Sequence, residues 1–371
     1  MHCDYFTAGE CRSCTLMTVP YAVQLADKDA RARAVLASVA ADAHWLPPQG
    51  SAESGFRNKA KLVVGGRAGQ VTLGILDQAG RGVDLQGCGL YEEPLSAAFG
   101  PIATWVDHLR LEPYSVPERR GELKHILLTA SPGGELMVRL VLRSTHRLAA
   151  IRNALPQLLA AVGSIVVVTA NIHPEHKAVL EGEREIVLTD ARELSMRVND
   201  IDLRLGPRSF FQTNTEVAAA LYRQAAGWAN SIAPQTIWDL YCGVGGFAGH
   251  LWQPGRAVLG VEVSEDAVAA ARHTVPGARF IAGDATAYAR DADRHPDLVV
   301  VNPPRRGLGA ELADWLQTCR AKHLIYSSCN VNSLAADLAR MPSWRVEEVR
   351  LFDMFPQTGH AEVAARISRS G

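Results

Sequence analysis

A cysteine ends an apolar, strand-like run in the segment "LIYSSCN", which spans Leu324 to Asn330. Two serines precede Cys329 and an asparagine follows it. A core cysteine has apolar neighbours, whereas a reactive thiol lies partly open in surroundings that stabilise its thiolate. A thiolate that adds to C6 of a pyrimidine makes C5 nucleophilic enough to attack the methyl group of a sulfonium donor. If the acceptor is such a pyrimidine, Cys329 is the candidate nucleophile; the alternative is a core cysteine, and the rest of the chain must distinguish the two.

Such a reaction also needs a base, because the methylated C5 keeps a proton that must leave before the thiolate is eliminated. The C-terminal segment "MFPQTGHAEVAARIS" contains two candidates. Glu362 lies between a turn-like segment and the last strand-like run, and is either this base or a surface acid. His360 is the competing base, since histidine ordinarily titrates near neutral pH.

Four further cysteines could hold a metal. Three follow the spacing C-x7-C-x2-C near the N-terminus, and the fourth lies in "LQGCGL"; they are Cys3, Cys11, Cys14 and Cys88. Four thiolates can bind zinc or an iron–sulfur cluster, and their spacing does not choose between the two. Disulfides are not expected in a reducing compartment. Of the remaining cysteines, we expect Cys242 to serve a turn and Cys319 to lie in the core.

The elements that position Cys329 begin near residue 210. Short apolar runs alternate there with helical patterns; the runs are "TIWDLY", "AVLGVEV", "ARFIAG", "DLVVVN" and "HLIYSS". Strands that alternate with helices predict a parallel, doubly wound sheet. Ligands of such sheets bind beyond the carboxyl ends of the strands, and Cys329 follows one of these ends.

The first of these strands runs into "DLYCGVGGFAGH", in which Gly243, Gly245 and Gly246 allow a tight turn close to a ligand. This loop fits a nicotinamide cofactor as well as an adenosyl one. Glu262, nineteen residues after Gly243, could bind the two hydroxyls of a ribose. Asp284, after the third strand, is either a contact of the adenine edge or a surface acid.

The fourth strand favours one of these cofactors. It ends in "NPPRR", where two prolines fix the backbone and leave Asn302 and nearby carbonyls as a rigid polar corner. A methyltransferase needs such a corner, because the methyl donor and the acceptor base must be held in line at close range. Together with the glycine loop and Glu262, this corner favours S-adenosylmethionine.

Length and composition limit the class of protein. The chain has 371 residues, of which 47% are hydrophobic and 21% charged, as in a globular protein of two or three units. We predict a segment with the four cysteines and a small α/β region over 1–90, an α+β region over 91–200, and a methyltransferase domain over 201–371. The sequence has no membrane-length apolar run and no visible secretory signal. It therefore predicts a cytoplasmic monomer without a membrane partner.

Two basic stretches stand out although the net charge is only −1. Residues 56–67 contain four basic residues and no acid, and residues 136–174 contain no carboxylate; the arginines of the second stretch are Arg139, Arg143, Arg147 and Arg152. Such stretches bind phosphates even in a neutral protein, or are simply solvated. We expect Arg57, Lys59 and these arginines to line one face that holds RNA. Apolar alternation over 136–142 predicts a strand with one polar face.

These segments together resemble the RNA 5-methyluridine methyltransferases. The resemblance covers nearly the whole chain and is carried by the N-terminal cysteines, "FFQTN", "DLYCGVGGF", "GVEVSEDAV", "NPPRRGLG", "YSSCN" and "TGHAEV". Within this family the chain most resembles the branch that methylates uracil 747 of bacterial 23S rRNA and carries a [4Fe–4S] cluster without a TRAM domain. The tRNA-modifying branch lacks the four cysteines.

The resemblance implies an α/β fold, in which an α+β RNA-binding region with an N-terminal iron–sulfur segment precedes a Rossmann-like S-adenosylmethionine methyltransferase domain. It implies that 23S rRNA is the partner, that Cys329 is the nucleophile and that Glu362 is the proton acceptor. It implies these cluster ligands: Cys3, Cys11, Cys14 and Cys88. It also implies these cofactor contacts: Gln212, Tyr241, Glu262 and Asn302. Asn302 departs from the wider family, whose other branches carry an aspartate there.

Two other functions remain open from the sequence. An RNA cytosine-C5 methyltransferase would share the glycine loop and the strand-end cysteine, but would resemble its own family in a second cysteine after the fourth strand, which "NPPRR" lacks. A non-catalytic iron–sulfur ribosome-binding factor would need none of the following residues, whose joint presence argues against it: Glu262, Asn302, Cys329 and Glu362.

Overall fold

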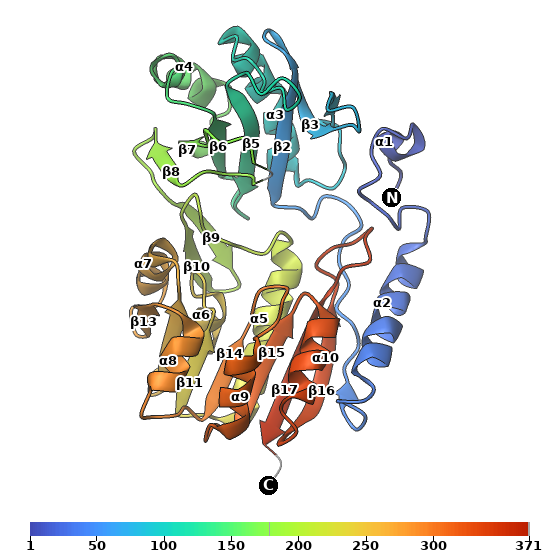
Figure 1. Ribbon diagram of the computed structural model, residues 1–371, viewed down its shortest axis with the longest axis vertical. Coiled ribbons are helices and arrows are strands. Elements are labelled where there is room, and N and C mark those ends of the chain that lie inside the picture. Colours follow the sequence, from blue (N-terminus) through green and yellow to red (C-terminus); the bar gives the residue numbers. More distant parts are fainter. Residues whose placement is uncertain (178, 370–371) are drawn as a thin grey trace. The chain divides into compact units, whose positions relative to one another are not determined.

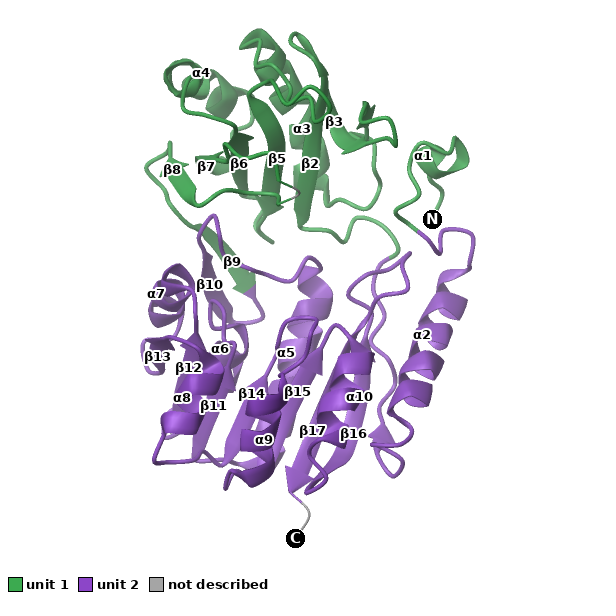
Figure 2. Cartoon of the chain, in the orientation of Figure 1, with its two compact units in different colours: residues 1–14, 53–197 green, residues 15–52, 198–371 purple. Residues whose placement is uncertain are grey.

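The structure is a computed structural model that describes residues 1–177 and 179–369 (Figure 1). It forms two compact units, the first comprising Met1–Cys14 and Glu53–Arg197, the second Thr15–Ala52 and Val198–Gly371 (Figure 2). The three predicted domains divide the chain differently, because residues 15–52 belong to the second unit and residue 90 lies inside the first. Within the described residues, every helix is too short or too polar to cross a membrane.

An eight-stranded sheet forms the centre of unit 2, with the strand order β1-β16-β17-β15-β14-β11-β12-β13. The strands are β1 (His44–Trp45), β11 (Thr236–Leu240), β12 (Ala257–Glu262), β13 (Arg279–Ala282), β14 (Leu298–Val301), β15 (His323–Ser328), β16 (Trp344–Phe352) and β17 (Glu362–Arg369). Neighbouring strands run parallel, except that β17 is antiparallel to both β15 and β16. The strand order reverses between β11 and β14, which confirms the predicted doubly wound sheet.

The helices of unit 2 connect these strands; they are α2 (Tyr21–Leu36), α5 (Thr215–Ile232), α6 (Gly246–Leu251), α7 (Glu265–Thr274), α8 (Ala285–Asp291), α9 (Ala310–Thr318) and α10 (Val331–Ala339). The central strands are buried along their length, as β14 shows with four buried residues out of four. Strands covered on both faces read as continuous apolar runs, which is why this part of the sequence is easy to interpret. Cys319 lies in this core, as predicted.

Unit 1 contains a seven-stranded sheet with the order β4-β3-β2-β5-β6-β7-β8. The strands are β2 (Lys59–Arg67), β3 (Gln70–Leu76), β4 (Gly82–Asp84), β5 (Leu123–Ala130), β6 (Leu136–Leu142), β7 (Ile165–Ile172) and β8 (Arg184–Val187), and the helices are α1 (Asp4–Thr7), α3 (Glu93–His108) and α4 (Leu148–Ala161). A separate two-stranded sheet follows along the chain, made of β9 (Leu194–Val198) and β10 (Ile201–Leu205), and unit 2 resumes at Val198.

The predicted basic face of unit 1 is partly wrong. All seven residues of β6 are buried, so this strand has no polar face. Arg139 is only 3% exposed and forms ion pairs with Glu181 at 2.6 Å and Glu185 at 2.7 Å. These carboxylates come from beyond the acid-free stretch and reach Arg139 through the tertiary structure. Lys59 is half-buried, and its burial lowers its pKa to about 8. Arg152 is exposed, as predicted.

Candidate active site

Residues that are far apart in the sequence meet at one edge of the unit 2 sheet. The strands β11, β12, β14 and β15 are parallel, so the residues that follow them gather at the same carboxyl edge (Figure 1). Glu262 ends β12, Asn302 follows β14 and Cys329 follows β15. The antiparallel strand β17 begins at this edge, with Ser328 opposite Val363, and its first residue is Glu362. The topology therefore brings the predicted nucleophile and base to one place.

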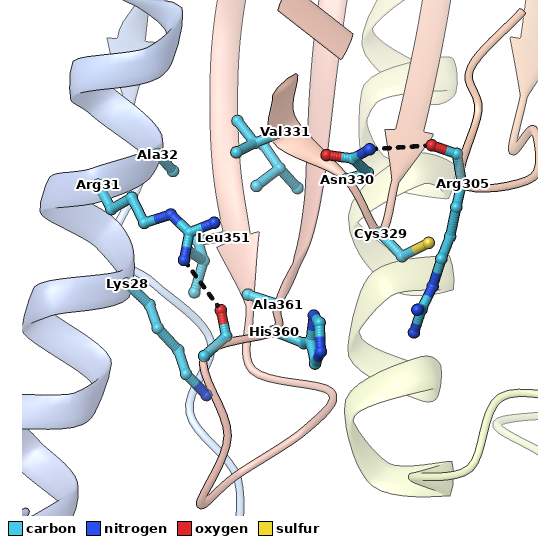
Figure 3. Close-up of a pocket in the computed structure, with 12 residues that line it drawn as sticks. Lys28, Arg31, Ala32, Arg305, Cys329, Asn330, Val331, Leu351, His360 and Ala361 are labelled. Carbon is cyan, nitrogen blue, oxygen red and sulfur yellow. Dashed lines mark hydrogen bonds between the residues drawn. The ribbon is translucent and has the colours of Figure 1, made fainter. Parts of the chain in front are cut away.

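Cys329 lines a cavity of about 250 Å³ within unit 2. Figure 3 shows its sulfur pointing toward the side chain of Arg305, which follows β14. The pKa of Cys329 is raised above its ordinary value by burial and by the charge of Glu362, which together outweigh the lowering effect of the charge and hydrogen bond of Arg305. The thiol is half-buried, as a reactive cysteine should be. Arg305 is thus placed to stabilise the thiolate.

Glu362 is not a surface acid, because its side chain is only 1% exposed. Its carboxylate accepts a hydrogen bond from the Ser327 hydroxyl. Burial raises the pKa of Glu362 to about 7, against a smaller opposing effect of Ser327. A carboxyl group with a pKa near 7 can take up and release a proton at neutral pH. A solvent-exposed glutamate would be fully ionised at neutral pH, but the buried Glu362 is not expected to be.

His360 also lines the cavity but is exposed, with its ring edge-on to Phe355 at 6.4 Å between centroids. Its position on the cavity wall keeps it as a rival base. The burial of Glu362 and its bond to Ser327 distinguish the two candidates, because a fixed and desolvated carboxyl group is typical of a general base.

The polar groups around Cys329 hold the turn in which it lies. The Ser328 hydroxyl donates to the carbonyl oxygen of Asn330 at 3.0 Å. The Asn330 side chain accepts a hydrogen bond from the backbone of Asn332 at 3.2 Å and caps helix α10. It also donates to the carbonyl oxygen of Arg305 at 2.9 Å (Figure 3). These bonds fix the turn after β15 and connect it to the segment after β14.

The loop after β11 has the backbone that a close ligand requires. Gly243 and Gly245 have φ values of 53° and 86°, in the left-handed region that favours glycine. Tyr241 adopts φ = 69°, which is unusual for a residue with a side chain and is often found at functional sites. The carboxylate of Glu262 accepts hydrogen bonds from the backbone nitrogens of Gly243 at 3.2 Å and Ser264 at 3.0 Å. These bonds hold a carboxylate with remaining acceptor capacity beside the glycine loop.

The other predicted cofactor residues lie in different surroundings. Gln212 is buried in the segment between β10 and α5, and Asn302 is half-buried after β14. Asp284 is exposed and caps helix α8 by accepting a hydrogen bond from the backbone of Ala287 at 2.8 Å. This cap gives Asp284 a structural role at the helix N-terminus. Cys242, also in the glycine loop, is buried as expected for a turn residue.

The four N-terminal ligand candidates all belong to unit 1, and each is a free thiol: Cys3, Cys11, Cys14 and Cys88. The hydroxyl of Tyr5 accepts a hydrogen bond from the backbone of Gly87 at 3.0 Å, which joins the α1 segment to the turn that contains Cys88. Burial, followed by the charges of the other three thiols, raises the pKa of Cys14 to about 11. Across residues 1–177 and 179–369, however, no three His, Cys, Asp or Glu side chains have an arrangement that holds a metal ion.

Sequence reasoning missed the residues that helix α2 contributes. Lys28 and Arg31 line the cavity of Cys329, although they lie about 300 positions away in the sequence. Arg305 was visible in "NPPRR" but only its position next to the cavity shows that it contacts the thiol. The basic spacing of α2 carried no signal by itself, because charged residues on a helix usually face solvent.

The fold and site define the class of S-adenosylmethionine-dependent methyltransferases. A solved structure with the same fold is the Pyrococcus abyssi tRNA (uracil-54, C5)-methyltransferase in complex with S-adenosyl-L-homocysteine, with a TM-score of 0.79 and 24% identity over 95% of this chain and 85% of that chain. The model of the tRNA (uracil-5-)-methyltransferase family matches residues 292–370.

Relatives in sequence extend over the whole chain. They include the 23S rRNA (uracil(747)-C(5))-methyltransferases RlmC of Edwardsiella ictaluri, 45% identical over 100% of both chains, and of Serratia proteamaculans, 43% identical over 100% of both. That of Yersinia pestis is 45% identical over 99% of both chains. The chain therefore belongs to the RNA uracil-C5 methyltransferase family. This membership contradicts the cytosine-C5 and non-catalytic alternatives.

Proposed function

We propose that the protein transfers a methyl group from S-adenosylmethionine to C5 of uridine 747 in 23S rRNA, which forms 5-methyluridine. The relatives that match this chain over its full length are named for this activity. The observation that carries the proposal is that Cys329, which lines the cavity, and the buried Glu362 lie at the same edge of the sheet.

The residues divide the reaction between them. Cys329 adds as a thiolate to C6 of the uracil, which places a pair of electrons at C5. S-adenosylmethionine, when bound, would supply an electrophilic methyl group. C5 would take this methyl group as the methyl–sulfur bond breaks, so a C–C bond would form and S-adenosylhomocysteine would leave. Glu362 then removes the C5 proton, and the returning electrons re-form the C5–C6 double bond as the thiolate leaves. Arg305 stabilises the thiolate before addition and after elimination.

The cofactor contacts follow from the same edge of the sheet. Glu262 would bind the ribose hydroxyls, because its carboxylate lies beside the glycine loop and keeps acceptor capacity. Tyr241, Gln212 and Asn302 would complete the site around the adenosyl and sulfonium groups. Positioning of this kind is a large part of methyl transfer, because the donor and acceptor carbons must be aligned at close range.

The function is tested by mapping 5-methyluridine in 23S rRNA from a strain that lacks the gene. We expect the modification at position 747 to disappear and to return with the wild-type protein. Purified protein should also methylate a 23S rRNA fragment that contains this uridine. A deletion strain that keeps the modification at 747 but loses 5-methyluridine elsewhere would show that the target, and not the reaction, is assigned incorrectly.

We infer that the N-terminal thiols come together around a [4Fe–4S] cluster, although among the described residues they are not arranged to hold a metal ion. Such a cluster would fasten the N-terminal segment to the rest of unit 1; the ligands would be Cys3, Cys11, Cys14 and Cys88. The location of all four cysteines in unit 1 as free thiols supports the inference, because ligation requires free thiols. The contact of Tyr5 with Gly87 supports it further, because it already joins the two cysteine-containing segments. All-thiolate ligation is typical of such clusters.

We expect anaerobically purified protein to be brown and to contain about four iron atoms per chain, with broad visible absorption. Cys88→Ser should lose the iron and make residues 1–14 more sensitive to proteolysis. Cys319→Ser is the matched control, because this thiol is buried in unit 2 and should leave the iron content unchanged. Stoichiometric zinc without iron in anaerobic protein would contradict the cluster.

A further inference from the structure

The cavity beside Cys329 has a basic wall that the reaction chemistry alone does not require. The described residues that line it include Lys28, Arg31 and Arg305 and no carboxylate (Figure 3). Two of these cations come from helix α2, which is far in the sequence from the strand ends that carry the catalytic groups. A wall of this kind attracts an anion.

The three cations are not equally available to a ligand. Lys28 is buried and donates to Asp353 at 2.7 Å, so its charge is already compensated. Arg305 lies beside Cys329 and acts on its thiol. Arg31 is exposed, and its hydrogen bond to the carbonyl oxygen of Gly359 is 3.5 Å long, which is at the limit for such a bond. Arg31 therefore has guanidinium donors to offer at the cavity.

Helix α2 is fixed to the segment that leads to Glu362. The Gln24 side chain donates to the Gln357 side chain at 2.9 Å and accepts from the Gln357 backbone at 3.0 Å. One turn further along α2, Lys28 holds Asp353 and the carbonyl oxygen of Phe355. Arg31 follows Lys28 by three positions, so it lies on the same helix face. These bonds hold Arg31 at a defined place on the cavity wall.

We propose that Arg31 binds the RNA backbone phosphate next to the target uridine. This inference rests on the proposed function, because a uridine that reaches Cys329 must bring its flanking phosphates to the cavity. A cavity of about 250 Å³ encloses a base but leaves a charged backbone at its margin. A guanidinium suits this position, since it binds phosphate oxygens with two parallel hydrogen bonds. Such a contact positions the RNA without reading its sequence.

The test measures methylation and binding of a 23S rRNA fragment that contains uridine 747. Arg31→Ala should raise KM and Kd for this fragment about tenfold, with a much smaller change in kcat at saturating RNA. The slope of log Kd against log salt should decrease by about one, which is the change expected when one phosphate contact is lost. Arg31→Lys should keep the salt slope but recover only part of the affinity, because an ammonium group lacks the bidentate geometry.

Arg33→Ala is the matched control on the same helix. Arg33 is paired with Asp29 at 2.7 Å and lies over the ring of Trp45, and it does not line the cavity. Its replacement should leave KM, Kd and the salt slope at wild-type values. Equal effects of Arg31→Ala and Arg33→Ala would mean that α2 acts only through general charge, which would overturn the proposal.

The carboxylate of S-adenosylmethionine is the other anion that Arg31 could meet. Calorimetry with S-adenosylmethionine alone separates the two ligands. Weaker cofactor binding by Arg31→Ala, with an unchanged RNA salt slope, would overturn the proposal, as would wild-type values for both ligands. A wild-type protein that binds the fragment but does not methylate it would instead overturn the proposed function, while the comparison of Kd values would still decide the role of Arg31.

Discussion

Cys329→Ala is expected to reduce methylation of the rRNA fragment by about 10⁴-fold or more, because removing a covalent nucleophile removes the reaction path itself. Without the thiolate, C5 of uracil is too poor a nucleophile to attack the methyl group. The variant should still bind RNA, since the thiol is one small group in a larger interface. Radiolabelled methyl transfer measures the methylated product, and denaturing gels measure the covalent RNA–protein species.

Cys242→Ala is the control for this experiment, because that thiol is buried in the glycine loop and its pKa is raised above the ordinary value by burial. It should still form the covalent species. Methylation by Cys329→Ala at a rate near that of the wild-type protein would contradict the whole mechanism.

Replacing Glu362 by Gln should have a different result, because the base acts only after methyl transfer. We expect a methylated RNA–protein species to accumulate and to survive denaturing gels, while product release slows by about 10²–10⁴-fold. Gln keeps the size and the capacity to accept the Ser327 hydrogen bond, but cannot take the C5 proton. His360→Ala should turn over normally. Normal turnover of Glu362→Gln together with trapping by His360→Ala would move the base to His360.

The pH dependence of adduct release follows from the pKa of Glu362, which burial raises to about 7. The active form is the carboxylate, so the release rate should rise with pH, level off above about 7, and fall tenfold per pH unit well below it.

The contribution of Glu362 to the stability of the folded protein has the opposite pH dependence. Because the folded-state pKa lies above the ordinary value of 4.5, the folded protein holds the proton more tightly, and this contribution to stability is present at low pH and lost as pH rises through about 7.

Local sequence was sufficient for the residues that follow parallel strands. Apolar runs buried on both faces are visible without knowledge of the fold, and the residue after each run must lie at the carboxyl edge of the sheet. Cys329, Asn302 and Glu262 could be placed at this edge for that reason. The glycine loop was equally local, because the left-handed backbone of Gly243 and Gly245 is encoded by residue type.

Long-range packing decided what the sequence could not. From the sequence, Glu362 could be either a surface acid or a base. In the fold, β17 lies between β15 and β16, which buries Glu362 and raises its pKa. Arg139 lies in an acid-free stretch, yet Glu181 and Glu185 reach it through the fold. Arg31 joins the cavity of Cys329 because segment 15–52 belongs to unit 2. Burial and charge pairing depend on which residues are neighbours in space, and a single sequence does not identify these neighbours.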